Sequence, residues 1–192
     1  MGRWIRWGVA IGALSTLMMD AGAIAMRALG LLRGLPPVAT GRWFGSMARG
    51  TFTHHDILES PPVRGEMPIA MATHYLIGCT LATGCVLLLR ARARASGSLS
   101  TRMNIALAMA YGTSTTVIAW FVMFPAMGYG LFGRHAPPPM QLFPSSLVNH
   151  AVYGGGLALW TYVFRHRLAA AFDVPVHGSM SVLSARDRPL GR

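Results

Sequence analysis

The sequence contains no lysine, only two cysteines and only six acidic residues. Charged residues make up 12% of its 192 positions, whereas soluble domains usually carry about 25%. This shortage of charge argues against a soluble domain and favours a protein that lies in a lipid bilayer. The positive charge comes from 17 arginines that lie between and beyond apolar runs. A nucleic-acid-binding protein clusters its arginines on one soluble face, together with aromatic side chains that stack on bases. We therefore expect no nucleic-acid partner.

The two cysteines, Cys79 and Cys85, fall within one apolar run. Six residues apart on a helix, they point about 240° from each other and cannot form a disulfide together. The sequence has no Cys-x-x-Cys pair, which leaves no thiolate metal motif. It also shows no nucleophile–base pair and no nucleotide-binding loop. Enzyme chemistry therefore has little support, although the question stays open.

Four apolar runs cover residues 7–32, 67–89, 105–124 and 147–164. A membrane-spanning helix needs about 20 apolar residues, and only helices or closed barrels satisfy the backbone in lipid. Alternation at period two is absent, which disfavours a barrel. We therefore predict an all-α fold, a four-helix membrane domain over residues 1–166 with a long loop at 33–66. Residues 167–192 are predicted to form a disordered cytoplasmic tail.

The N-terminus also resembles a secretory signal, because Arg3 and Arg6 precede an apolar stretch and the small residues 21–23. The apolar character continues past that site to Leu32, which favours a full membrane span. Two arginines at the N-terminus, four in residues 90–104 and five after Phe164 make eleven on one side. On the other side, the loop at residues 33–66 holds four arginines and the loop at residues 125–146 holds one. Positive charge prefers the cytoplasm, so both termini are predicted to be cytoplasmic.

Three ionisable residues lie inside the predicted helices: Asp20, His74 and His150. Placing an ionisable side chain at membrane depth costs at least about 2.5–3.5 kcal/mol. Each of the three should therefore face the protein interior. At a rise of about 1.5 Å per residue, all three fall in the outward half of the bilayer. Each also continues a stripe of small residues at intervals of four, such as Gly8, Gly12 and Thr16 before Asp20. Such stripes bring helices close, so the three side chains should converge inside the bundle.

Three interpretations of this convergence stay open. The first is structural: the histidines form hydrogen bonds between helices, and Asp20 pairs with Arg27, two turns along its helix, or with a histidine of another helix. The second is a site for a metal ion or a haem, with His54 or Glu66 from the long loop completing the ligands. The third is a path for protons or a substrate. The structural interpretation fits a structural or accessory subunit, which acts with a protein partner or as a homo-oligomer.

Several short motifs, in this order, resemble a family of bacterial inner-membrane proteins known as domain of unknown function 2938. They are Gly41-Arg42-Trp43, Gly50-x-Phe52-x-His54, Gly65-Glu66, His74-Tyr75 with Gly78, Pro125-Ala126-x-Gly128-x-Gly130 and His150-x-Val152-Tyr153-Gly154. The resemblance covers residues 10–165. The sequence departs from the family's motifs at Ala70-Met71 and at Phe124. It implies a multi-pass protein of the bacterial inner membrane. It also implies that His54, Glu66, His74 and His150 are the polar positions of interest.

Overall fold

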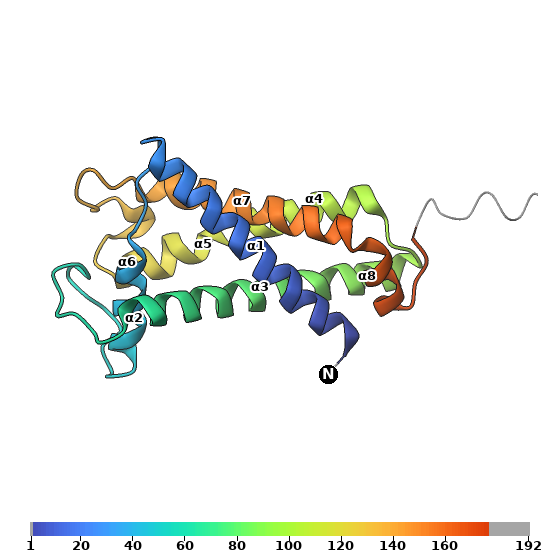
Figure 1. The fold of residues 1–192 in the computed structure, drawn as a ribbon, viewed down its shortest axis with the longest axis horizontal. Coiled ribbons are helices and arrows are strands. Elements are labelled where there is room, and N and C mark those ends of the chain that lie inside the picture. Colours follow the sequence, from blue (N-terminus) through green and yellow to red (C-terminus); the bar gives the residue numbers. More distant parts are fainter. Residues whose placement is uncertain (1, 177–192) are drawn as a thin grey trace, which may run out of the picture.

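The computed structural model describes residues 2–176, and this part of the chain is helical, without a β-strand (Figure 1). The long helices are α1 (Arg3–Ala28), α3 (Glu66–Ser96), α4 (Thr101–Ser114) and α7 (Leu142–Val163). After α4 the chain continues through α5 (Thr116–Ile118), the π-helix η1 (Ala119–Met123) and α6 (Phe124–Ala126). The shorter elements are α2 (Pro37–Met47), the 3-10 turn η2 (Leu131–Gly133) and α8 (Arg165–Phe172). The prediction of an all-α fold is confirmed.

Within residues 2–176, three helical segments are long and apolar enough to cross a membrane: Arg3–Ala28, Glu66–Ser96 and Thr101–Ala126, which runs from α4 to α6. A helix of 26 residues is about 39 Å long, against about 30 Å for the hydrocarbon core of a bilayer. Large apolar side chains cover the outside of these helices, for example Leu17, Ile24, Leu76 and Phe121, each more than half exposed. Exposed apolar surface on this scale marks contact with another apolar medium. The chain is therefore built as a helical membrane protein.

The fourth predicted span corresponds to α7, which has 22 residues. Its length is sufficient to cross a bilayer, but its mean hydropathy is lower than that of the three helical segments named above. The reason is its polar half, which carries Ser145, Ser146, Asn149 and His150. These polar side chains are buried or half-buried, so α7 turns its polar side into the bundle, whereas apolar side chains such as Leu147 and Leu159 are exposed.

Several predicted boundaries need correction. The helix predicted over 67–89 continues to Ser96, because arginine is a good helix former, and it stops where Gly97 adopts a left-handed conformation with φ of 71°. The predicted loop 33–66 contains α2, which begins with Pro37 at its first turn. The tail predicted to be disordered from residue 167 is helical up to Phe172. Residues 177–192 of that tail lie outside the described part.

Small residues set the packing of the long helices. Gly8 lies against Thr83, and Gly12 against the backbone of Cys79, so that α1 packs closely on α3. Further along α1, Gly22 lies against Val152 of α7. The first helix thus crosses obliquely from α3 towards α7 (Figure 1). Residues of α1, α3 and α7 line a space in this part of the bundle.

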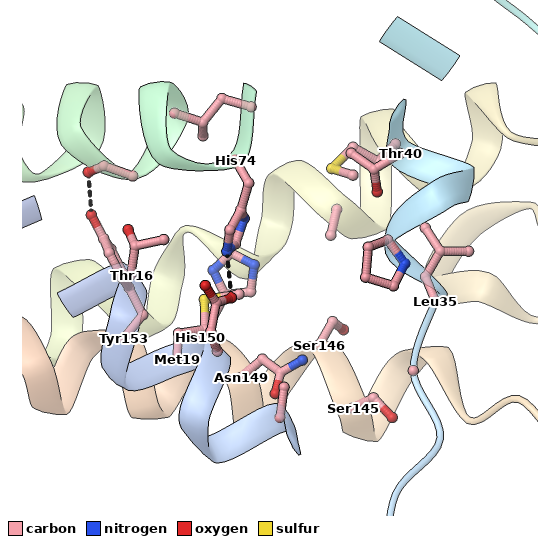
Figure 2. A pocket seen from close by; sticks show the side chains of 18 of the residues that line it. Thr16, Met19, Leu35, Thr40, His74, Ser145, Ser146, Asn149, His150 and Tyr153 are labelled. Atoms are coloured by element: carbon pink, nitrogen blue, oxygen red, sulfur yellow. Dashed lines mark hydrogen bonds and ion pairs between the residues drawn. The ribbon is translucent and has the colours of Figure 1, made fainter. Parts of the chain in front are cut away.

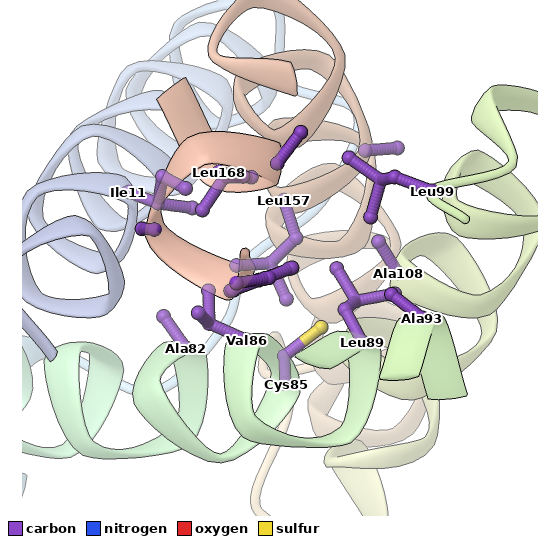
Figure 3. Close-up of a cluster of buried hydrophobic side chains, with 14 of the residues drawn as sticks. Ile11, Ala82, Cys85, Val86, Leu89, Ala93, Leu99, Ala108, Leu157 and Leu168 are labelled. Atoms are coloured by element: carbon purple, nitrogen blue, oxygen red, sulfur yellow. The ribbon is translucent and has the colours of Figure 1, made fainter. Parts of the chain in front are cut away.

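Two apolar clusters fill the bundle on either side of that space. One includes Ile11, Val86, Leu89 and Leu157, and α8 covers it with buried residues such as Leu168 (Figure 3). The other lies at what we call the loop end, the end formed by residues 29–65 and 127–141. It is formed by the buried residues Ala39, Trp43, Ile57, Ala119, Phe124, Met127, Tyr129 and Leu142. The end covered by α8 is called the α8 end.

Candidate functional site

A cavity of about 260 Å³ lies between the two apolar clusters. Residues of α1, α3 and α7, the segment after α4 and residues 34–40 line it. Most of its wall is apolar, with side chains such as Leu35, Ile77 and Met123. Asp20, His74 and His150 all line it as well, and Figure 2 shows the two histidines with Asn149, Ser145 and Ser146 nearby. An apolar wall with a few convergent polar groups is the usual build of a ligand site.

The carboxylate of Asp20 bridges α1 and α3. His74 Nε2 lies 2.9 Å from Asp20 Oδ1, and the Tyr75 hydroxyl donates to Oδ2 at 3.1 Å. A carboxylate accepts hydrogen bonds, so His74 Nε2 carries a hydrogen and Nδ1 makes no hydrogen bond with the described residues. The side chains of Asp20 and His74 are 26% and 32% exposed. The cavity therefore reaches this pair.

This pairing decides between the two partners predicted for Asp20. The ion pair between Asp20 and Arg27 does not form in the described part of the chain, whereas the histidine of another helix does pair with Asp20. Arg27 is exposed and lines a different cleft. The physical reason is geometric: His74 and Tyr75 lie directly across from Asp20, whereas Arg27 lies about 10 Å further along the helix axis.

The imidazole of His150 is held by Thr115, at the break between α4 and α5. The Thr115 hydroxyl lies 2.6 Å from the carbonyl of Gly112 and 2.8 Å from His150 Nδ1. A carbonyl oxygen carries no hydrogen, so the single hydrogen of the hydroxyl must lie between these two oxygens. His150 Nδ1 is therefore the donor to Thr115, which leaves Nε2 as an acceptor without a partner among residues 2–176. The interruption of the helix at Thr115 positions this contact.

Tyr153 lines the cavity and also belongs to the apolar cluster at the α8 end. Its hydroxyl donates to the carbonyl of Gly78 at 2.6 Å. On the wall, the buried Ser145 hydroxyl has no hydrogen-bond partner within residues 2–176. The same holds for the buried Thr16 hydroxyl. Unpartnered buried polar atoms are uncommon in folded proteins and often belong to sites that take up a further group. The cavity thus offers acceptors and donors that the protein itself does not use.

The other two predicted site residues lie elsewhere. Glu66 opens α3 and accepts a short hydrogen bond of 2.6 Å from Arg42 Nε on α2. His54 Nδ1 lies 2.9 Å from the Ser60 hydroxyl, which itself donates to the backbone of Asp56. Burial lowers the pKa of His54, so its neutral form is favoured. Neither residue lines the cavity of Asp20, His74 and His150.

Arg42 organises the loop end, a role that the sequence does not reveal by itself. Its guanidinium bonds both carboxylate oxygens of Glu66 and also the backbone carbonyls of Ile57, Leu58 and Ser60. The side chains of Arg42 and Glu66 are only 11% and 12% exposed. The only signal in the sequence is that both residues fall in the motifs of the family resemblance. Their spacing of 24 positions gives no hint that they pair.

The metal interpretation gains no support from this geometry. Within residues 2–176, no three His, Cys, Asp or Glu side chains are placed to hold a metal ion together. Asp20, His74 and His150 share a cavity but do not form such a group. The arrangement fits hydrogen bonding to a guest molecule better than coordination.

Comparison with known protein families gives a match over most of the chain. The model of a family described as "Protein of unknown function (DUF2938)" matches residues 9–164. The chain belongs to this family. No curated protein and no solved structure matches it.

Proposed function

We propose that the chain is a multi-pass protein of the bacterial inner membrane with four spanning helices. The fourth is α7, which packs between α1 and α4 and keeps its polar side chains inside the bundle. The excess of arginines at the N-terminus, at residues 90–104 and after Phe164 supports cytoplasmic termini. The loop end then faces the outside.

A topology experiment tests this orientation. In a background without Cys79 and Cys85, Glu59→Cys places one thiol at the loop end, and Ala95→Cys places one near the end of α3. Both positions are exposed. We expect a membrane-impermeant maleimide to label Glu59→Cys in intact spheroplasts and Ala95→Cys only after lysis. Labelling in the opposite order would refute the orientation.

We further propose that the function is to bind a small, mostly apolar molecule that carries a hydrogen-bonding group. The observation that supports this is the cavity of about 260 Å³ beside Asp20, His74 and His150. An apolar cavity of about 150 Å³ is already large enough for benzene. The imidazole nitrogens that face no protein partner can hold a hydroxyl or a similar group. A path for protons across the whole bundle is less well supported, because an apolar cluster fills the α8 end.

The test uses isotope-labelled 1-octanol and purified protein in phosphatidylcholine nanodiscs, followed by equilibrium dialysis against empty nanodiscs. We expect one saturable site per chain in the wild type. His150→Leu should weaken binding roughly twofold to tenfold, because one hydrogen bond contributes about 0.5–1.5 kcal/mol. His166→Leu, at an exposed position of α8, is the matched control and should bind normally. Binding no greater than in empty nanodiscs would refute the proposal and favour a structural or accessory role.

A further inference from the structure

A second cleft, of about 560 Å³, lies at the loop end and is basic. Arg27 and Arg33 line it, together with Pro36, the three prolines at 137–139, Leu58, Met140 and Gly34, and no acidic residue is among its lining. Neither guanidinium forms an ion pair within residues 2–176. Proline has no backbone N–H, so the two arginines are the main donors in this cleft. Guanidinium groups in such a setting favour a carboxylate or a phosphate.

The basic cleft and the cavity share a wall. Gly34 lines both of them. Around it the lining alternates: Leu35 and Pro37 line the cavity, whereas Pro36 lines the cleft. Across from this segment, the Gln141 backbone N–H donates to the Arg33 carbonyl at 2.8 Å and holds the wall in place. Gly34, which has no side chain, therefore lies between the two spaces, next to Ser145 of α7.

From this adjacency we infer the class of the ligand: an amphiphile with a carboxylate or phosphate at one end, an apolar chain, and a hydroxyl further along it. The inference rests on the binding function proposed above. The anionic group lies between Arg27 and Arg33, the chain passes Gly34, and the hydroxyl reaches Asp20, His74 or His150. Arg27 and Asp20 are seven residues apart on α1, which is about 10.5 Å along the helix axis. An extended chain of about eight carbons covers that distance.

The experiment compares 8-hydroxyoctanoate with 1-octanol in the same nanodisc dialysis. We expect the wild type to bind 8-hydroxyoctanoate about tenfold more tightly, because hydrogen bonds to charged groups are stronger than neutral ones. The variant Arg27→Gln/Arg33→Gln should lose that advantage and still bind 1-octanol like the wild type. Arg49→Gln, which removes an exposed arginine outside the cleft, should keep it.

The outcomes separate this inference from the proposed function. If 1-octanol binds but 8-hydroxyoctanoate binds no better, or if its advantage survives in Arg27→Gln/Arg33→Gln, the anionic subsite is refuted and the cavity site stands. If 1-octanol does not bind, the proposed function fails. A further arm adds phosphatidylglycerol to the nanodiscs. Competition with 8-hydroxyoctanoate would identify a membrane lipid as the source of the anion, and its absence a free amphiphile; both results support the subsite.

Discussion

Replacing Arg42 with methionine is expected to lower the melting temperature of the detergent-purified protein by about 10 °C. The substitution leaves the Glu66 carboxylate, 12% exposed, without its counter-charge. It also removes the donor to three backbone carbonyls of residues 57–60. Breaking one side of a buried ion pair costs about 3–5 kcal/mol. For a chain of this size, each kcal/mol shifts the melting temperature by about 2–4 °C.

Two further variants make the result specific. Arg49→Met removes an exposed arginine just beyond the same helix and should leave the melting temperature within about 2 °C of the wild type. The double variant Arg42→Met/Glu66→Leu should be less destabilised than Arg42→Met alone, because no unpaired carboxylate remains. An unchanged melting temperature in Arg42→Met would show that the loop end does not depend on this ion pair.

The two loops at the loop end also bond to one another, in addition to the bonds of Arg42 with residues 57–60. The backbone of residues 54–57 bonds to the carbonyls of Ala126 and Met127, and the Tyr129 hydroxyl donates to Asp56 at 3.0 Å. Burial raises the pKa of Tyr129 well above its usual value, so its hydroxyl keeps its hydrogen. These contacts hold residues 54–57 against the chain at residues 126–129.

The long helices could be predicted from the sequence because lipid makes their signal strong: a run of about 20 mostly apolar residues indicates a membrane span. The segment 37–47 is not predicted as a helix for the opposite reason. It has 11 residues, too short for a span, and its arginine and tryptophan resemble a stretch at the membrane surface. Its Arg42 bonds to residues further along the chain, contacts that no local pattern reveals.

The candidate site could be predicted in part. Stripes of small residues place Asp20, His74 and His150 on packing faces, and the structure brings all three to one cavity. The contribution of Thr115 could not be foreseen, because it depends on an interruption in a continuous apolar run. The adjacency of Arg27 and Arg33 to this cavity also depends on how residues 29–36 turn back over the bundle. Loop paths of this kind follow from tertiary contacts and leave little trace in periodicity.

Two glycines meet where α4 crosses α7, with Gly112 facing Gly154. A Cβ atom on Gly154 would come within 2.6 Å of the Met109 carbonyl and 3.1 Å of the Thr113 amide nitrogen. These are backbone atoms, which cannot move aside as a flexible side chain can. Overpacking costs about 1–3 kcal/mol, or more where the surroundings are rigid. A substitution at Gly154 must therefore push the two helices apart.

We expect Gly154→Val to lower the melting temperature by about 10 °C, because a cost of about 3 kcal/mol corresponds to a shift of this size. It should also weaken the binding of 1-octanol at least as much as His150→Leu does, since separation of α4 and α7 breaks the contact between Thr115 and His150, now 2.8 Å. Gly155→Ala is the matched control: its Cβ would meet only the end of the Met109 side chain, at 3.7 Å. Alanine is the better helix former, so this variant should melt at or above the wild-type temperature and bind 1-octanol normally. A Gly154→Val protein that is as stable as the wild type and binds 1-octanol equally well would show that the helices do not cross at these glycines.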